Sequence, residues 1–440
     1  GQNKAYILAF IVWGGIAMAA LDTQTESQLE QQFALAAERF EAGDISGAQA
    51  VLEDMLTKVP DHPIILNYLA VIAHLSGDLI RAEGLLRNSV KIMPDFFDAW
   101  NNLGLVAFGQ GKHEDAAHAF QQACSLAPEA PDPTINRAHA LQAQERFNEA
   151  VEAYGRGLAM QPDHPTAWAA FSRACLEDGR WQDAAFAADR QLALKPGHTV
   201  ALALKSVALQ QLGEGKAWRE LVDFDRLIGA FDIDVPAGYA DLATFNKALI
   251  DFCQNHRSLK YAPSDKATEF GSQTNNLAPE TDSPVAELLL AIGKCAEQYR
   301  SERPLSSDHP FLSQRPDNWE CDIWATVLEN GVHQQSHIHR VGWLSGVYYA
   351  QKPAVINADM PASDMAGWIE FGRPVFYPKA KAEPMTRCYP PVEGRLYLFP
   401  SYFYHRTIPF FSETPRISLA FDLRDRPVTR QVPFIDYVDG

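Results

Sequence analysis

The stretch LAVIAHLSGDLIRAEGLLRNSVKIMP (residues 69–94) sets the architecture of the first half of the chain. It ends in one of a series of prolines that recur every 34 residues. A period of this length is typical of tandem helix hairpins, in which each hairpin buries the apolar face of its neighbour. The prolines of the series are Pro60, Pro94, Pro128, Pro162 and Pro196.

Small and large residues keep a constant spacing from these prolines. Small side chains let two antiparallel helices approach closely, large apolar ones fill the layer between hairpins, and proline ends the second helix. We therefore predict a helical solenoid over residues 29–196, with a degenerate sixth hairpin at 197–229. The small positions are Ala36, Ala70, Gly104, Ala138 and Ser172, and Ala48, Ala82, Ala116, Ala150 and Ala184; the large ones include Leu35, Leu69, Leu103 and Phe171, and Leu52, Leu86, Phe120 and Tyr154.

This pattern resembles the tetratricopeptide repeat (TPR) family over about residues 29–196, and Trp100 and Trp168 stand where that motif often has tryptophan. The resemblance implies an all-α TPR solenoid, which we place at residues 29–230, that binds a peptide or protein along a concave groove. The repeat positions themselves are expected to pack the core and to carry no chemistry.

The composition limits the partners and the compartment. The chain of 440 residues has 55 acidic residues against 38 Lys plus Arg, a net charge of −17. Nucleic acids and anionic membranes attract basic surfaces, so we expect neither as a partner. Because the six cysteines are widely spaced and form no Cys-x-x-Cys pair, free thiols and a cytoplasmic location are expected.

The amino-terminal residues 1–28 form a segment of their own. Residues 6–21 (YILAFIVWGGIAMAAL) are apolar and follow Lys4, but the run is short for a membrane span of about 20 residues. We expect a helix that packs on the next domain or on a second copy in a homodimer. An export signal or a membrane anchor are the alternatives.

After about Phe231 the 34-residue period stops, and residues 231–440 form the second large part of the chain. Residues 284–302 (PVAELLLAIGKCAEQYRSE) have the apolar period of a helix. From Trp319 onward, short strand-like runs alternate with turn residues, as in CDIWATVLE (321–329) and RISLAFDL (416–423). Many short strands with regular turns predict a sandwich or barrel, here a jelly roll with flanking helices.

Histidines mark a candidate metal site in this second part. His337 and His339 are two residues apart, so an extended strand would place both side chains on one face. His405 follows another predicted strand, and Arg416 and Ser418 share a face of the strand after it. Non-heme Fe(II) oxygenases hold iron by three protein groups on one face and leave the other positions open. Arginine suits a carboxylate because its planar fork binds both oxygens.

The motifs SHIHRVGWLSGVYY (336–349), GWIEFG (367–372), EGRLYLFPSYFYHRTIPF (393–410) and PRISLAFDL (415–423) resemble the Fe(II)/2-oxoglutarate-dependent oxygenase superfamily, over about residues 240–430. The resemblance implies a double-stranded β-helix that uses Fe(II), 2-oxoglutarate and O2. His337 and His405 would bind iron, Arg416 would bind the far carboxylate of 2-oxoglutarate, and Ser418 would assist. The implied activity is hydroxylation of a side chain of a peptide or protein, with succinate and CO2 as co-products.

This chain departs from the superfamily at His339, where Asp or Glu is usual. Either His339 is the third ligand, or water completes the site, or another residue replaces it. His333 is one such residue, and the nearby acids Glu329, Asp364, Glu370 and Glu393 are others, with Glu370 the best placed.

Further residues are expected near the cosubstrate or substrate. Tyr348 and Tyr349 lie on opposite faces of one strand, so one of them points inward and can bind the cosubstrate. Trp343, His333 and Glu370 are candidates for contacts with the substrate or with the ligands.

The same residues are compatible with two other functions. The first is a TPR adaptor whose jelly roll has lost catalytic activity. The second is a three-histidine dioxygenase that needs no 2-oxoglutarate. Arg416 argues against it, because such an enzyme has no 2-oxoglutarate for this arginine to bind.

Overall fold

The computed structural model describes residues 23–261, 268–269, 271–357, 365–375 and 377–425. The chain divides into two compact units between Ala167 and Trp168. Most of the predicted amino-terminal segment lies outside the described residues, and the first described helix begins at Thr23, before the predicted start of the solenoid at residue 29. Within the part of the chain that the structure describes, no helix is both long and apolar enough to cross a bilayer.

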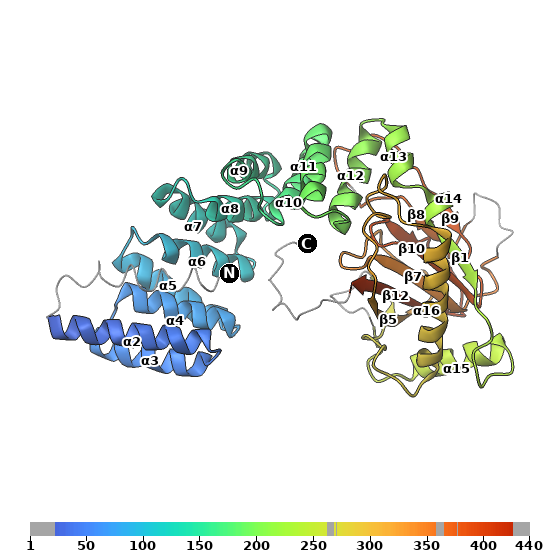
Figure 1. Ribbon diagram of the computed structural model, residues 1–440, viewed down its shortest axis with the longest axis horizontal. Coiled ribbons are helices and arrows are strands. Elements are labelled where there is room, and N and C mark those ends of the chain that lie inside the picture. Colours follow the sequence, from blue (N-terminus) through green and yellow to red (C-terminus); the bar gives the residue numbers. More distant parts are fainter. Residues whose placement is uncertain (1–22, 262–267, 270, 358–364, 376, 426–440) are drawn as a thin grey trace. The chain divides into compact units, whose positions relative to one another are not determined.

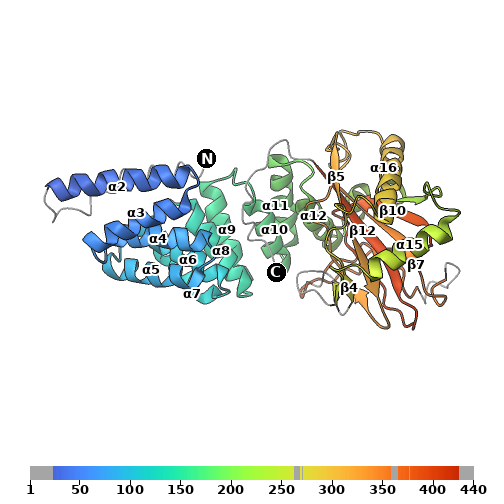
Figure 2. The same ribbon diagram turned by 90° about the horizontal axis from the view of Figure 1, so that it is seen from below.

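The first unit is a run of antiparallel helix hairpins, coloured from blue to teal in Figures 1 and 2. Consecutive helices pack against one another, as a TPR solenoid requires. The helices are α2 (Thr23–Glu41), α3 (Ile45–Lys58), α4 (Pro63–Leu75), α5 (Leu79–Ile92), α6 (Phe97–Gly109), α7 (His113–Leu126), α8 (Pro131–Ala143) and α9 (Phe147–Met160).

The small repeat positions are buried between the helices, as predicted. Gly104 shows why size matters: a Cβ built there would lie 2.5 Å from the ring of Phe120. Leu69 and Leu103 are also buried, whereas Leu35 in the first repeat is exposed. The close approach of α6 and α7 therefore depends on the absence of a side chain at residue 104.

The second unit opens with two helix pairs and ends with the β-domain. The sixth hairpin, predicted at 197–229, is present as α12 and the shorter α13. Helix α16 has the predicted bounds. The helices of this unit are α10 (Ala167–Asp178), α11 (Trp181–Leu194), α12 (Thr199–Gln211), α13 (Gly215–Leu221), α14 (Phe224–Leu227), α15 (Leu242–Gln254) and α16 (Pro284–Glu302).

The strands form an antiparallel major sheet in the order β1-β10-β7-β12-β5-β4-β2, with two smaller sheets, β11-β8-β9 and β3-β6. This is the predicted jelly-roll type of domain, and the strand-like runs from Trp319 onward are all strands. The other, short strands were not predicted: β1, β2, β3, β4, β6, β9 and β11. The strands are β1 (Gly229–Asp232), β2 (Lys260–Tyr261), β3 (Thr268–Glu269), β4 (Ser272–Gln273), β5 (Trp319–Leu328), β6 (His333–Gln334), β7 (Leu344–Gln351), β8 (Ile369–Phe371), β9 (Arg387–Tyr389), β10 (Arg395–Pro400), β11 (His405–Thr407) and β12 (Arg416–Asp425).

Helices α15 and α16 cover one face of the major sheet (Figure 1). On that face the Tyr348 hydroxyl of β7 donates a hydrogen bond to Asn246 Oδ1 of α15 at 2.6 Å. The neighbouring residue Tyr349 therefore points to the opposite face, because side chains alternate along a strand. This opposite face holds the candidate site.

Helices α10 and α12 belong to the same compact unit as the β-domain and contact its loops. Lys379 Nζ pairs with Asp178 Oδ1 at 2.8 Å, and Thr199 Oγ1 donates to the carbonyl of Gly342 at 3.2 Å. The predicted boundary at residue 230 falls within β1, just after the helical hairpins, whereas the compact units divide earlier, at residue 167.

Candidate metal centre

Backbone hydrogen bonds bring the three histidines together from two distant segments. The amide of His337 donates to the carbonyl of His405 at 3.1 Å, and the amide of His405 donates back to His337 at 3.0 Å. Two residues further along the chain, the amide of His339 donates to the carbonyl of Ser401 at 3.0 Å. These bonds pair residues 337–339 with the segment from Ser401 to His405, and the ring nitrogens of the three histidines converge.

The three imidazoles are close enough to share one ion. One ring nitrogen from each of His337, His339 and His405 lies within 4.8 Å of those of the others. The ring centroids of His337 and His405 are 4.3 Å apart, and that of His339 lies 5.0 Å from His405. Three nitrogens on one side of an ion leave further coordination positions open.

Each ring is also held in the tautomer that a metal needs. Nδ1 of His337 lies 2.7 Å from the carbonyl oxygen of Gln335, and Nδ1 of His405 lies 2.9 Å from that of Phe403. Nδ1 of His339 lies 2.5 Å from Oδ1 of Asp422. Because these partners accept hydrogen bonds, each Nδ1 carries the proton and each Nε2 keeps a lone pair. The donor set therefore fits a divalent transition metal.

Burial favours the neutral form of two of the three imidazoles, those of His337 and His405. Burial lowers the pKa of His337 to about 4, with the neighbouring His339 acting in the same direction. Burial, His337 and His339 together lower the pKa of His405 well below its ordinary value. Neutral imidazole is the form that binds a metal, so these two ligands need not lose a proton at neutral pH.

The nearby acids do not join this cluster. The Glu370 carboxylate is buried in β8, and Arg373 Nε donates to it at 2.8 Å, while Arg406 Nε donates to the same oxygen. Burial raises the pKa of Glu370, but these hydrogen bonds bring it below the ordinary value. Glu370 therefore pairs across the small sheet and is not a replacement ligand.

The other candidate ligands also lie elsewhere. His333 is in β6 and outside the three-histidine cluster. Glu393 accepts the amide of Lys352 at 2.9 Å, Glu329 is exposed, and Asp364 lies outside the described residues. Among the described residues, His339 is thus the group that completes the cluster.

A second polar site lies on the same sheet face, around Arg416. The Arg416 side chain is 2% exposed, and its Nη2 donates to the hydroxyl of Tyr349 at 3.3 Å while Nη1 lies 3.5 Å from Ser418 Oγ. Its Nε has no hydrogen-bond partner, and among the described residues no carboxylate pairs with this guanidinium. A buried cation without an anion is costly, so the site is built for an anionic ligand.

Thr326 is a member of this site that the sequence did not reveal. It lies opposite Ser418 in the pairing of β5 with β12, and Ser418 also lies opposite Tyr349 of β7. Cross-strand partners share a face, so these three hydroxyls surround one region. Thr326 Oγ1 is buried and has no hydrogen-bond partner. Only the register of β5 against β12 could have shown this.

The two tyrosines now have separate places. Tyr349 and Ser418 accept hydrogen bonds from Arg416, so their own O–H groups remain available to a ligand. Tyr348 lies on the helix-covered face with Asn246, which corrects its prediction as a cosubstrate residue. Trp343, for which we predict a contact with the substrate, stacks on Phe311 with ring centroids 5.6 Å apart.

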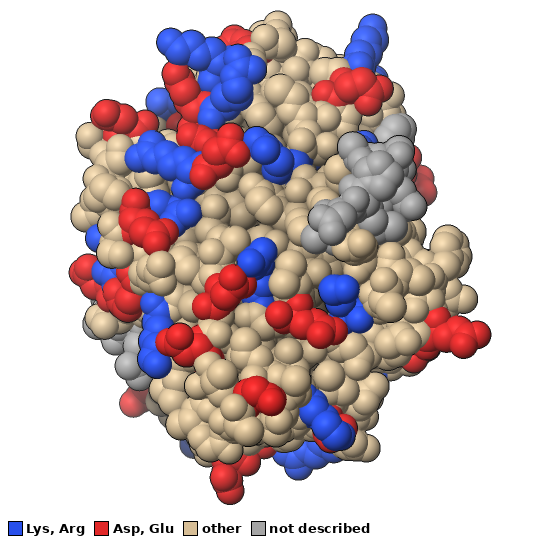
Figure 3. All heavy atoms as spheres, turned by 90° about the vertical axis from the view of Figure 1, so that its right-hand side faces the viewer, with Lys and Arg blue, Asp and Glu red and all other residues tan. Residues whose placement is uncertain are grey.

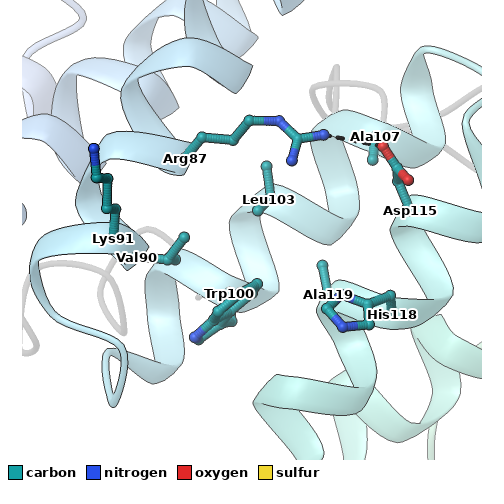
Figure 4. A pocket seen from close by; sticks show the side chains of 9 residues that line it. All are labelled: Arg87, Val90, Lys91, Trp100, Leu103, Ala107, Asp115, His118 and Ala119. Atoms are coloured by element: carbon teal, nitrogen blue, oxygen red, sulfur yellow. Dashed lines mark hydrogen bonds and ion pairs between the residues drawn. The ribbon is translucent and has the colours of Figure 1, made fainter.

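The first unit has a pocket of its own, shown in Figure 4. It encloses about 270 Å³ between α5, α6 and α7. Its rim carries an ion pair in which Arg87 Nη2 lies 3.0 Å from Asp115 Oδ2. The remaining lining residues are Val90, Lys91, Trp100, Leu103, Ala107, His118 and Ala119.

The surface charges are mixed in sign on the face seen in Figure 3, where basic and acidic side chains alternate over the molecule. The excess of acidic residues is thus not gathered into one patch on that face.

Comparison with known proteins agrees with both halves of this description. Residues 322–422 match the family model described as "Putative 2OG-Fe(II) oxygenase". Residues 33–92, 97–130 and 135–199 match models of the tetratricopeptide repeat. The chain therefore joins a TPR solenoid to a domain of the 2-oxoglutarate/Fe(II) oxygenase type. No curated protein matches it.

Several solved TPR structures are similar to part of the chain. A structure of MamA is 20% identical over 36% of this chain and 94% of its own, with a TM-score of 0.35. A MamA fragment from Desulfovibrio magneticus RS-1 is 16% identical over 40% of this chain and 95% of its own, with a TM-score of 0.35. YrrB, described as a TPR protein with an unusual peptide-binding site, is 16% identical over 40% of this chain and 91% of its own, with a TM-score of 0.37.

Proposed function

We propose that the protein is an Fe(II)- and 2-oxoglutarate-dependent oxygenase that hydroxylates a side chain of a peptide or protein. The observation that supports the proposal most strongly is Arg416, whose guanidinium is buried and has no anionic partner among the described residues. Arg416 lies on the same face of β12 as Asp422, the residue in contact with His339. A three-histidine dioxygenase that uses no 2-oxoglutarate has no need of such a group. An inactive adaptor would have no reason to keep it unpaired.

Two groups of residues in this chain would bind the metal and 2-oxoglutarate. Nε2 of His337, His339 and His405 would hold Fe(II), which with 2-oxoglutarate and O2 supplies the oxidation of a C–H bond and yields succinate and CO2. Arg416, Tyr349 and Ser418 would bind the far carboxylate of 2-oxoglutarate, with Thr326 as a further donor.

An aromatic wall would shield the centre from water. The ring of Trp324 stacks on His339 at 5.6 Å, and the ring of Phe399 lies 4.8 Å from that of His405. A site lined in this way strengthens the polar contacts inside it and limits side reactions.

For the TPR unit we propose that the pocket of Figure 4 takes an apolar side chain of the peptide. The Trp100 and Leu103 side chains offer apolar area, and a pocket of this size suits one large side chain. Removing much of its apolar surface by Trp100→Ala should weaken binding of peptides selected on the parent protein, whereas Lys216→Ala, on an exposed side chain elsewhere, should not.

All six cysteines are free, and we propose a reducing compartment for the protein. Burial raises the pKa of Cys253 to about 12 and that of Cys388 to about 11, so these thiols are unreactive at neutral pH.

Formation of succinate by the purified full chain tests the proposed function. We expect succinate that requires both added Fe(II) and added 2-oxoglutarate, and that increases with the peptide substrate. Absence of succinate with and without candidate peptides would favour the adaptor. Oxygen uptake that needs Fe(II) but is indifferent to 2-oxoglutarate would favour the three-histidine dioxygenase.

A further inference from the structure

Asp422 lies directly behind His339. Its Oδ1 atom is 2.5 Å from His339 Nδ1, and the two side chains are 11% and 8% exposed. The Ser345 hydroxyl donates to the same Oδ1 at 2.6 Å and lies 2.7 Å from the hydroxyl of Ser401. The carboxylate is thus anchored by β7 and aimed at the ring of His339.

The loop that contains Gly342 passes so close to the Asp422 carboxylate that it leaves no room for a side chain at residue 342. A Cβ built on Gly342 would collide with the Ser401 hydroxyl and would lie 3.3 Å from Asp422 Oδ1. Only glycine allows the backbone that follows His339 to pass this closely over Asp422 and Ser401. The contact is therefore part of how the loop folds and not a chance approach of two side chains.

Asp422 is in direct contact with His339, whereas its charge acts on Arg424 only as the weakest of the carboxylates around that guanidinium. Among the described residues, no Lys or Arg forms an ion pair with it. The nearby Arg424 is held by Asp322 at 2.6 Å and by Glu320 at 3.2 Å. His339 is consequently the group toward which the negative charge of Asp422 is directed.

We propose that Asp422 is a positioning residue that supplies, through His339, the negative charge that a ligating carboxylate would place beside the metal. Three neutral imidazoles leave a divalent ion uncompensated, whereas a carboxylate that accepts the Nδ1 proton makes the ring a stronger donor. The proposal rests on the metal centre of the proposed function. It explains how this chain can carry histidine at residue 339, where an acid is usual in the superfamily that it resembles.

The test compares metal binding by Asp422→Asn and Asp322→Asn in the full chain. Asp322 lies opposite Asp422 in the pairing of β5 with β12, so its substitution removes the same charge from the neighbouring strand without touching His339. Fe(II) affinity is measured anaerobically by calorimetry, and the visible spectrum of bound Co(II) reports the ligand field. We expect Asp422→Asn to lose about 10- to 100-fold in affinity and to shift the Co(II) spectrum. Asp322→Asn should change neither.

A second variant separates charge from structure. In the double variant His339→Asp/Asp422→Asn, the carboxylate moves into the ligand position, and Fe(II) affinity should return toward that of the parent. An affinity of Asp422→Asn equal to the parent's would overturn the proposal. A loss that His339→Asp does not restore would also overturn it, because the loss would then be structural.

The outcome also distinguishes this proposal from the proposed function. If the parent chain binds Fe(II) and forms succinate while Asp422→Asn binds equally well, only the role of Asp422 is wrong. If the parent chain binds no Fe(II), the proposed function and the role of Asp422 are both wrong.

Discussion

Replacing Arg416 by methionine should weaken 2-oxoglutarate binding and stabilise the apoprotein at the same time. The guanidinium is 2% exposed and its Nε has no hydrogen-bond partner. Its hydrogen bonds to Tyr349 (3.3 Å) and Ser418 (3.5 Å) are long, and its Cζ lies 4.8 Å from the centre of the Tyr349 ring. A buried charge paired with a ligand carboxylate contributes about 2–5 kcal/mol to binding. At about 1.4 kcal/mol per factor of ten, this corresponds to a roughly 30-fold to few-thousand-fold rise in the Kd for 2-oxoglutarate.

The apoprotein should respond in the opposite direction. Methionine fills most of the same volume without a charge to desolvate, and replacing buried charges by apolar groups is often neutral or stabilising by about 1–4 kcal/mol. The assay is calorimetric titration of 2-oxoglutarate with Mn(II) in place of Fe(II), together with thermal unfolding without ligand. Arg395→Met, on a partly exposed residue that pairs with Asp232, is the control and should leave 2-oxoglutarate binding unchanged. An unchanged Kd in a folded Arg416→Met protein would refute the role of Arg416.

Three further predictions concern the pocket hydroxyl, the histidines and the solenoid. Thr326→Val removes a buried hydroxyl without a partner, so unfolding experiments should show a stability equal to or up to about 1 kcal/mol above the parent's, with a several-fold weaker 2-oxoglutarate affinity by titration. Folding lowers the pKa of His337 from 6.5 to about 4, so the unfolded chain binds more protons than the folded chain between these pH values. The free energy of unfolding of the apoprotein should therefore fall by up to about 3 kcal/mol as the pH drops from 6.5 to 4. Urea unfolding at each pH measures this, and a free energy that does not change with pH would contradict it. Gly104→Val should destabilise the first unit by about 1–3 kcal/mol because its side chain meets Phe120, seen as an earlier unfolding transition by calorimetry, whereas Gly84→Ala, with nothing within 4 Å, should not.

The parts of the fold that were predicted correctly are those with a local signal. The 34-residue period reports the solenoid because each hairpin repeats the same packing, and the helix at residues 284–302 is evident from its apolar period. Strands β5, β7 and β12 are long enough to show their apolar and β-branched character. The strands β1, β9 and β11 are three or four residues long, and they form because the sheet supplies partners that no local pattern records.

The sequence by itself determined the two modules and pointed to the three histidines, Arg416 and Ser418, but not to Thr326 or Asp422. The pattern His337-x-His339, followed by His405 and by Arg416-x-Ser418, can be recognised in the sequence because alternation along a strand places residues i and i+2 on one face. What only the tertiary structure decided is which face is the inner one, and so that Tyr349 and not Tyr348 joins Arg416. The tertiary structure also decided which group accepts a hydrogen bond from Nδ1 of each histidine.

Asp422 shows why the sequence alone could not predict such contacts. It is 83 residues from His339 in sequence, and nothing local distinguishes it from the other acids of the chain. The pairing of β12 with β7 sets it opposite Ser345, and the fold of the loop at Gly342 brings His339 over it. Alternation along a strand is a property of neighbouring residues, whereas the contact between a ligand and its supporting carboxylate depends on sheet register, which the packing of the whole domain determines.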